Sequence, residues 1–332
     1  MKEVVVLGGG SGMSSILRGM KNIPNINISA IVTVADDGGS TALMRREFNI
    51  PAVGDLRQIL IALSSTEDIL KDLMEYRFHN KNIKKSVFHN QSLGNIIISS
   101  LININNDFYK GIETLSKVLK IKGSIYPLTD YPKVRLQAVY TDGTKIIGEH
   151  KIPNGNKIID SIRYLNTKKI KTNPDVLKQI KKADYIVIST GSLYTSIIPN
   201  LIAPGVREAI LDNKKVKLIY IGNVMTQYGE TQNMSLYEHV IAIEKHLNMN
   251  ENTLNNKIQI QVIIANNRQI NSKILGYYEK ENSFPVYLDE NNPYFRGKLW
   301  LVDLIDDSST TNLVRHDFKK IENVLTKVFT TV

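Results

Sequence analysis

The chain has 332 residues, of which 42% are hydrophobic, and its formal net charge is +10. It contains no cysteine, which excludes disulfides, cysteine-ligated zinc, iron–sulfur clusters and a thiol nucleophile. No apolar run reaches the ~20 residues of a membrane span, and the apolar run near the start is too short for a secretory signal. We therefore expect a cytoplasmic protein with no membrane insertion.

The excess of basic residues is spread over runs rich in lysine and asparagine, such as NKNIKK, NTKKIKTN and LDNKKVK. Runs of this kind are typical of solvated loops and helix surfaces. Proteins that bind single-stranded nucleic acid combine a cationic groove with clustered aromatic side chains, and no such cluster is evident. We expect no nucleic-acid partner.

The segment 1–65 predicts a βαβ unit. Val4 to Leu7 form an apolar run that ends at glycines, and SSILRGMKNI carries apolar residues at helical spacing. ISAIVTVADDGG then gives a second apolar strand that runs into acids and glycines. Two strands joined in this way are parallel, and their crossover is right-handed.

Further along, GDLRQILIALSS and SLGNIIISSLI predict helices, whereas VRLQAVYTDGTKIIGEHKI predicts a β-hairpin around Asp142-Gly143. The parallel pattern resumes with YIVIST, KLIYIGN and IQIQVIIANN as strands and LYEHVIAIEKHL as a helix. A late strand, KLWLVDLID, precedes a C-terminal helix. We predict one α/β domain over 1–332, a Rossmann-like, doubly wound and mainly parallel sheet with a small β-rich hairpin insertion around 125–155.

The glycine-rich turn after the first strand is the first candidate ligand site. It consists of Gly8, Gly9, Gly10, Ser11 and Gly12. Glycines there let the backbone approach a phosphate, and the free amides at the start of the following helix attract an anion. The spacing is not the GxGxxG of dinucleotide-binding proteins, which argues against an NAD-dependent oxidoreductase. A tight turn without a ligand remains the structural alternative.

Acidic and basic side chains follow close by. Asp36, Asp37 and Gly38 end the second predicted strand, so they should lie at the carboxyl edge of the sheet. The two carboxylates could hold a hydroxyl pair, a divalent ion or the loop itself. Asp55 opens a helix, where the helix dipole favours an acid whatever the function. Arg57 suits bidentate contact with a phosphate, or a surface salt bridge.

Polar loops also follow two later strands, and they contain Gly191, Ser192, Thr195, Asn223, Thr226 and Glu230. Loops at one edge of a parallel sheet form a crevice, which is the usual ligand position in open α/β folds. No hydrolytic triad or metal-ligand spacing stands out among the six histidines. We expect His239 and His246 at the surface of a helix or at the edge of the core.

Taken in order, GGGSG, VADDGGS, GDLR, SLGN, GSLYTSIIPNL, NVMTQYGET and EHVIAIEKH resemble the YvcK-type gluconeogenesis factors, relatives of 2-phospho-L-lactate transferase. The resemblance covers roughly residues 1–320. It implies a Rossmann-like core, a cytoplasmic bacterial protein and a requirement for growth on gluconeogenic carbon sources. It also implies a role in cell shape and wall synthesis, binding of UDP-sugars such as UDP-N-acetylglucosamine, a homodimer and a wall-synthesis protein as partner.

The same resemblance implies the ligand contacts. The diphosphate of a nucleotide sugar or other nucleoside diphosphate would lie against residues 8–12. Asp36 and Asp37 would line the site, together with Asn95 of the SLGN string. The far wall would be formed by Gly191, Ser192, Asn223 and Thr226.

The transferase relatives use magnesium to move a phospholactyl group, so magnesium with a nucleoside diphosphate is the candidate cofactor. This chain has Gln91 where the family generally has histidine, and glutamine cannot shuttle a proton. That departure favours a UDP-sugar-binding regulator over a magnesium-dependent transferase acting on a nucleoside diphosphate conjugate. Whether the chain is an enzyme stays open, and no catalytic residue is assigned.

Overall fold

The computed structural model of the chain describes residues 1–79, 86–249, 257–306 and 313–331. Within these residues the main sheet has seven strands, and all of their pairings are parallel. In spatial order the strands are β10 (Leu299–Val302), β9 (Val262–Asn266), β8 (Lys217–Ile221), β7 (Tyr185–Ile188), β1 (Lys2–Gly8), β2 (Ile26–Val32) and β3 (Ser124–Pro127). The predicted Rossmann-like α/β fold is confirmed.

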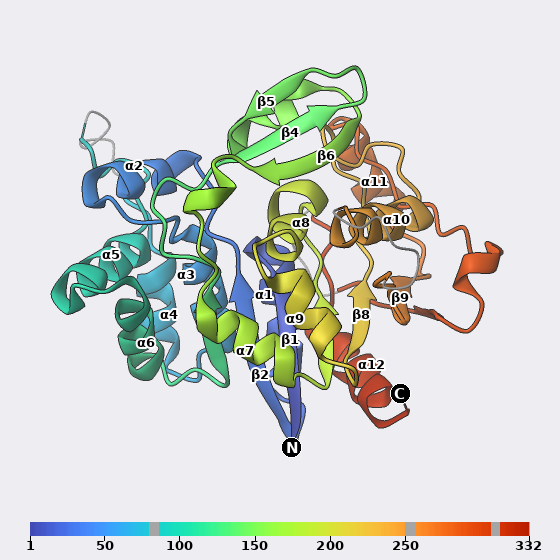
Figure 1. The fold of residues 1–332 in the computed structure, drawn as a ribbon, viewed down its shortest axis with the longest axis horizontal. Helices are drawn as coiled ribbons and strands as arrows, with labels where there is room; N and C mark the ends of the chain where they lie inside the picture. The colour runs from blue at the N-terminus through green and yellow to red at the C-terminus, as the bar shows by residue number, and fades with distance from the viewer. Residues whose placement is uncertain (80–85, 250–256, 307–312, 332) are drawn as a thin grey trace.

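Helices cover both faces of this sheet (Figure 1). The first half of the chain contributes α1 (Gly10–Met20), α2 (Gly39–Phe48), α3 (Gly54–Leu63), α4 (Asp68–Glu75), α5 (Leu93–Asn105) and α6 (Phe108–Val118). The second half contributes α7 (Pro174–Lys182), α8 (Ile198–Leu201), α9 (Val206–Asp212), α10 (Leu236–Leu247), α11 (Ser272–Glu279) and α12 (Phe318–Thr331). None of the helices in the described part of the chain has the length and apolar character that crossing a bilayer requires.

The central strand β1 is buried on both faces because its apolar side chains alternate between two hydrophobic cores. Val4 and Val6 pack with apolar residues of α1, α3 and α12. Val5 and Leu7 pack with those of α7, α8, α9 and α10. A continuous apolar run therefore forms a strand here because both of its faces are covered.

A small antiparallel sheet interrupts the parallel pattern. Its strands are β4 (Leu136–Tyr140), β5 (Lys145–Ile147) and β6 (Ile159–Tyr164), in the order β5-β4-β6. The turn between β4 and β5 is the predicted one, with Gly143 at φ +81 and Asp142 accepting a hydrogen bond from Thr144 N–H at 2.9 Å. In Figure 1 this sheet lies at the far end of the molecule from the N-terminus.

The insertion differs from the expected segment 125–155 at both ends. β3 is a strand of the main sheet, paired in parallel with β2, so the insertion begins later. β6 pairs with β4 and continues to Tyr164, so it also ends later. A hairpin signal reports two strands and their turn, and it carries no information about a third strand that joins after an irregular loop.

Two histidines of α10 were expected at the surface of the helix or at the edge of the core. The expectation of a surface position was wrong. His239 and His246 are 0% and 4% exposed. His246 Nε2 accepts a hydrogen bond from Ile162 N–H at 3.0 Å, and its Nδ1 lies 2.7 Å from the Ala242 carbonyl oxygen. Burial lowers the pKa of His246 to about 4. The neutral imidazole thus joins α10 to the small sheet.

The strand order places a topological switch point between β1 and β7. From β1 the chain runs to β2 and β3 on one side, and it later returns to β7, β8, β9 and β10 on the other. Connections on opposite sides leave a crevice outside the carboxyl ends of the two strands at the switch. The fold therefore directs a ligand to the loops that follow β1 and β7.

The crevice depends on a close contact at Gly12. A Cβ at this position would overlap the Thr190 carbonyl oxygen and approach Gly191 N at 2.8 Å. No flexible side-chain end is present to move away, because the contacted atoms belong to the backbone. Glycine at this position lets α1 lie directly against the loop that follows β7.

We predict that Gly12→Ala lowers the free energy of unfolding by about 1–3 kcal/mol, because the added methyl group overpacks this contact. Chemical denaturation would measure the change. Gly276→Ala is the matched control, since nothing lies within 4 Å of its Cβ position in α11. There alanine should stabilise by about 0.5–1 kcal/mol. Equal effects of the two substitutions would contradict the packing argument.

Candidate functional site

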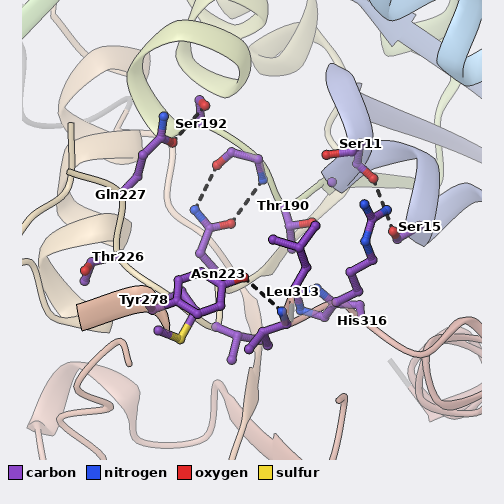
Figure 2. A pocket seen from close by; sticks show the side chains of 16 residues that line it. Ser11, Ser15, Thr190, Ser192, Asn223, Thr226, Gln227, Tyr278, Leu313 and His316 are labelled. Carbon is purple, nitrogen blue, oxygen red and sulfur yellow. Dashed lines mark hydrogen bonds between the residues drawn. The ribbon is translucent and has the colours of Figure 1, made fainter. Parts of the chain in front are cut away.

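A pocket of about 320 Å³ opens at the switch point. Ser11 and Gly12 contribute one wall from the start of α1, and Thr190, Gly191 and Ser192 contribute a second wall from the loop after β7. The loop after β8, residues 223–227, forms the third wall, and Tyr278 with residues 313–316 forms the fourth (Figure 2). Three loops expected to meet at this edge of the sheet do so.

Asn223 ties two of these loops together. Its Oδ1 accepts a hydrogen bond from Gly191 N–H at 3.1 Å, and its Nδ2 donates to the Gly191 carbonyl oxygen at 2.8 Å. Figure 2 shows this pair of dashed lines facing the Asn223 amide. Gly191 has φ +138, in the region that favours glycine. Both polar ends of Asn223 are therefore committed to shaping the loop.

Glu230 performs a similar structural task beneath the pocket. Its two carboxylate oxygens accept hydrogen bonds from Tyr194 N–H at 2.9 Å and from Thr195 Oγ1 at 2.7 Å. Burial raises the pKa of Glu230, although these hydrogen bonds act in the opposite direction. The hydrogen bond between Glu230 and Thr195 lies at the start of the π-helical turn Leu193–Ile197. It therefore fixes the loop after β7 to the loop after β8.

Two further side chains of the far wall also have protein partners. Thr226 Oγ1 accepts a hydrogen bond from Phe284 N–H at 2.9 Å. Ser192 Oγ donates to Gln227 Oε1 at 2.8 Å, as Figure 2 shows. The hydroxyl groups of both residues therefore hold the loops of this wall together.

By contrast, two buried polar atoms of the pocket lining have no hydrogen-bond partner in the described structure: Thr190 Oγ1 and His316 Nε2. Burial lowers the pKa of His316 to about 4, while a hydrogen bond to the Gly222 backbone acts in the opposite direction. The imidazole is thus neutral near pH 7. Buried polar groups are usually paired, so these two atoms indicate a position for a polar ligand.

The glycine-rich turn is partly occupied by a side chain. The Gly10 backbone hydrogen-bonds to the carboxylate of Asp55, and a Cβ at Gly9 would lie 2.5 Å from Asp55 Oδ2. Gly8 is held through its carbonyl oxygen by Asn200 Nδ2 at 2.9 Å. Of the residues predicted to meet a phosphate, Ser11 and Gly12 are those that line the pocket.

Asp55 belongs to a group of acids beside the pocket. Burial, and then the charge of Asp36, raise the pKa of Asp55 to about 7. Burial, followed by the charges of Asp36 and three other acids, raises the pKa of Glu149 to about 8. None of these acids lines the pocket itself. Glu149 comes from the small insertion, and no motif in the sequence singled it out.

The two acids in the loop after β2 have different hydrogen-bond partners. Asp36 Oδ1 accepts a hydrogen bond from Gly38 N–H at 2.9 Å, within its own turn. Asp37 Oδ1 accepts one from His150 N–H at 3.0 Å, on the small insertion. Asp36 lies near enough to Asp55 for its charge to raise the pKa of Asp55 further, whereas Asp37 ties the loop to the insertion.

Arg57 and Asn95 lie away from the pocket, in the interior between α3, α4 and α5. Arg57 is 7% exposed and donates from Nη1 to the Met74 carbonyl oxygen at 3.2 Å. Asn95 donates from Nδ2 to Ser40 Oγ at 3.0 Å. Arg57 forms no surface salt bridge among the described residues, which was one of the two roles considered for it from the sequence. Arg57 Nε, Asn95 Oδ1 and Gln91 Oε1 are buried without a partner in the described structure.

The fourth wall of the pocket was missed in the sequence. Tyr278 comes from α11, and its hydroxyl accepts a hydrogen bond from Val314 N–H at 2.9 Å. Arg315 and His316 follow directly and also line the pocket. These residues reach the site only through the tertiary fold.

Comparisons with known proteins identify the family of the chain. The sequence model of the family described as "2-phospho-L-lactate transferase CofD" matches residues 4–298. A "Gluconeogenesis factor" of Halalkalibacterium halodurans is 38% identical over 98% of this chain and 95% of its own length. A "Gluconeogenesis factor" of Bacillus subtilis is 36% identical over 97% of this chain and 96% of its own.

A crystal structure of a Bacillus halodurans protein superposes with a TM-score of 0.88 at 36% identity, covering 99% of both chains. The fold thus defines a Rossmann-like α/β protein. By the family match and the full-length similarity to gluconeogenesis factors, the chain belongs to the CofD family.

We predict that Asp55 makes the stability of the chain depend on pH. Its folded pKa of about 7 exceeds the ordinary value of 3.8, so the folded state holds this proton more tightly. The free energy of unfolding should therefore fall as the pH rises from 4 to 7. Because Asp55 keeps partial solvent contact, we expect Asp55→Asn to remove about 2 kcal/mol of this fall.

Urea unfolding of the wild type and Asp55→Asn at a series of pH values would measure the difference. Glu47→Gln, at an exposed position, is the control and should follow the wild type. Parallel pH profiles for the wild type and Asp55→Asn would contradict the assignment.

Proposed function

We propose that the chain binds a nucleotide sugar of the UDP class in the switch-point pocket. The observation that carries this proposal is the pair of unpartnered polar atoms, Thr190 Oγ1 and His316 Nε2. The two residues line the pocket, and the two atoms are buried directly behind its surface. A ligand rich in hydroxyl and phosphate oxygens would supply the missing partners.

The diphosphate would lie against Ser11 and Gly12. These residues belong to the first turn of α1, where backbone amides have no acceptor within the helix and the helix dipole attracts an anion. The first turn of α1 contains no acidic residue of its own, and the Asp55 carboxylate contacts the backbone at Gly10, not at Ser11 or Gly12. Arg315 lines the same pocket, and its guanidinium suits bidentate contact with a phosphate.

The opposite side of the pocket is more apolar. Met225, Leu313 and the ring of Tyr278 line it, and they form a surface on which a base or a sugar face could pack. Pockets for small molecules commonly combine an apolar lining with a few placed polar groups. This division supports a ligand with a charged centre and flat, less polar ends.

The role that fits such a pocket is regulation by ligand binding. The acids with raised pKa values lie outside the pocket, and no acid–base pair faces its centre among the described residues that line it. The similarity to gluconeogenesis factors supports a cytoplasmic regulator of growth on gluconeogenic carbon sources. A link to cell shape through a wall-synthesis protein partner, and a homodimer, form part of the same proposal.

Calorimetric titration with UDP-N-acetylglucosamine tests the proposal. We expect saturable binding by the wild type and at least about tenfold weaker binding by Arg315→Gln, because a charge-assisted hydrogen bond contributes about 1.5–3 kcal/mol. Arg296→Gln removes an exposed arginine that does not line the pocket, and it should bind like the wild type. Absence of binding by the wild type at millimolar ligand would overturn the proposal.

A second candidate function is a magnesium-dependent transferase acting on a nucleoside diphosphate conjugate. The specific observation is the pair of acids Asp36 and Asp55: burial, and then the charge of Asp36, raise the pKa of Asp55. The described residues contain no group of three or more side chains that could hold a metal ion. Magnesium often binds through one or two carboxylates together with phosphate oxygens. On this hypothesis the diphosphate of the conjugate would lie at these two acids, beside the switch-point pocket and not inside it.

On that hypothesis Asp36→Asn should reduce metal-dependent turnover at least about 100-fold, since it removes one of two anionic ligands. Asp37→Asn is the matched control, because its carboxylate is bonded to the His150 backbone. Circular dichroism would verify that both variants are folded. Turnover unchanged in Asp36→Asn, or lost equally in both variants, would contradict this arrangement.

A further inference from the structure

A second cleft, of about 800 Å³, lies between α2 and the small antiparallel sheet. Its walls are α2, the segment 131–135, the turn 147–151 and the segment 165–169. None of the described residues that line this cleft lines the switch-point pocket. Its volume is within the range of small-molecule sites, so it is a separate concave surface large enough for a ligand.

The cleft is strongly cationic, and its positive charges come from every wall. They are Arg45, Arg46, Lys133, Arg135, Lys151 and Lys169. Asp37 is the single carboxylate among the described lining residues, and its Oδ1 already accepts a hydrogen bond from His150 N–H. The charge within the cleft is therefore largely uncompensated by the protein.

Four of these cations also lack an ion-pair partner elsewhere. Arg46 pairs with the exposed Glu47 at 2.8 Å. Lys133, Arg135, Lys151 and Lys169 are exposed and are not among the described residues that form ion pairs. Like charges gathered around one concavity create a positive potential that concentrates anions there.

Arg45 fixes the geometry of the two facing walls. Its Nη1 donates to the Asp36 carbonyl oxygen at 2.6 Å and to that of Ala35 at 3.3 Å. Its Nη2 donates to the carbonyl oxygens of Pro132 at 3.0 Å and Val134 at 2.6 Å. This half-buried guanidinium joins the loop after β2 to the segment 131–135, so it connects two walls of the cleft before any ligand arrives.

We propose that this cleft is a second ligand site and that it takes a small polyanion, a molecule with two or more phosphate groups or with a phosphate and carboxylates. The bounded volume favours a small molecule over a nucleic acid. Among the described lining residues Tyr131 and His150 carry the aromatic rings, whereas proteins that bind single strands stack successive bases on several rings along a groove.

Calorimetric titration of the full chain with inorganic tripolyphosphate at constant ionic strength tests this site. We expect saturable binding with a stoichiometry of one, both with and without excess UDP-N-acetylglucosamine. The double variant Arg135→Gln/Lys151→Gln should bind at least about tenfold more weakly, because it removes two of the unpaired charges. The matched control Lys178→Gln/Lys214→Gln removes two exposed charges elsewhere and should bind within about twofold of the wild type.

Arg315→Gln separates this site from the nucleotide pocket, and it should leave tripolyphosphate binding unchanged even if the proposed function fails. The proposal is overturned if the wild type shows no saturable binding, or if the control double variant loses as much affinity as the cleft variant. It is also overturned if Arg315→Gln abolishes binding while the cleft variant retains it. If a single-stranded oligonucleotide binds more tightly than tripolyphosphate, and the cleft variant loses this binding, the assignment of a small-molecule ligand is wrong and the cleft binds nucleic acid.

Discussion

The architecture of the site rests on the direct contact between helix α1 and the loop that follows β7. Gly12 makes this contact possible, because any side chain there would overlap the Thr190 carbonyl oxygen. The contact brings the first turn of α1 beside the polar loop at the switch point. The two hydrogen bonds between Asn223 and Gly191 then fix the loop after β8 against the same surface, which completes three walls of the pocket.

Polar residues near the pocket divide into two groups with different tasks. Asn223, Thr226 and Glu230 have their hydrogen-bonding groups committed to the protein, and they give the loops a fixed shape. Thr190 and His316 keep unpartnered atoms that a ligand can use. A pocket whose loops are already held by hydrogen bonds is suited to recognising one ligand, since little conformational entropy is lost on binding.

Much of the fold could be predicted from local sequence patterns. Helix α10 spans Leu236–Leu247, the predicted segment, because Ser235 and Glu238 form a capping box and its apolar residues follow helical spacing. The strand that ends at Gly8 and the hairpin turn at Gly143 also have local signals. The third strand of the small sheet depends on pairing between distant segments, and nothing in its own sequence marks it.

The site was less predictable, for a physical reason. The loops at the carboxyl ends of β1, β7 and β8 follow from the parallel pattern. Arg315 and Tyr278 reach the same pocket from distant parts of the chain, and tertiary packing alone brings them there. Arg57 had the right chemistry for a phosphate, but the packing of α3 against α4 and α5 turns it into the interior. Residue type identifies candidates, and the fold decides which of them meet.

The most direct test of the central claim is a crystal structure of the chain grown with UDP-N-acetylglucosamine. The account predicts electron density for the ligand at the switch point, with its diphosphate against Ser11 and Gly12 and within hydrogen-bonding distance of Arg315. Thr190 Oγ1 or His316 Nε2 should gain a partner from the ligand. Ligand density at another place on the molecule, with the switch-point pocket holding only solvent, would contradict the account.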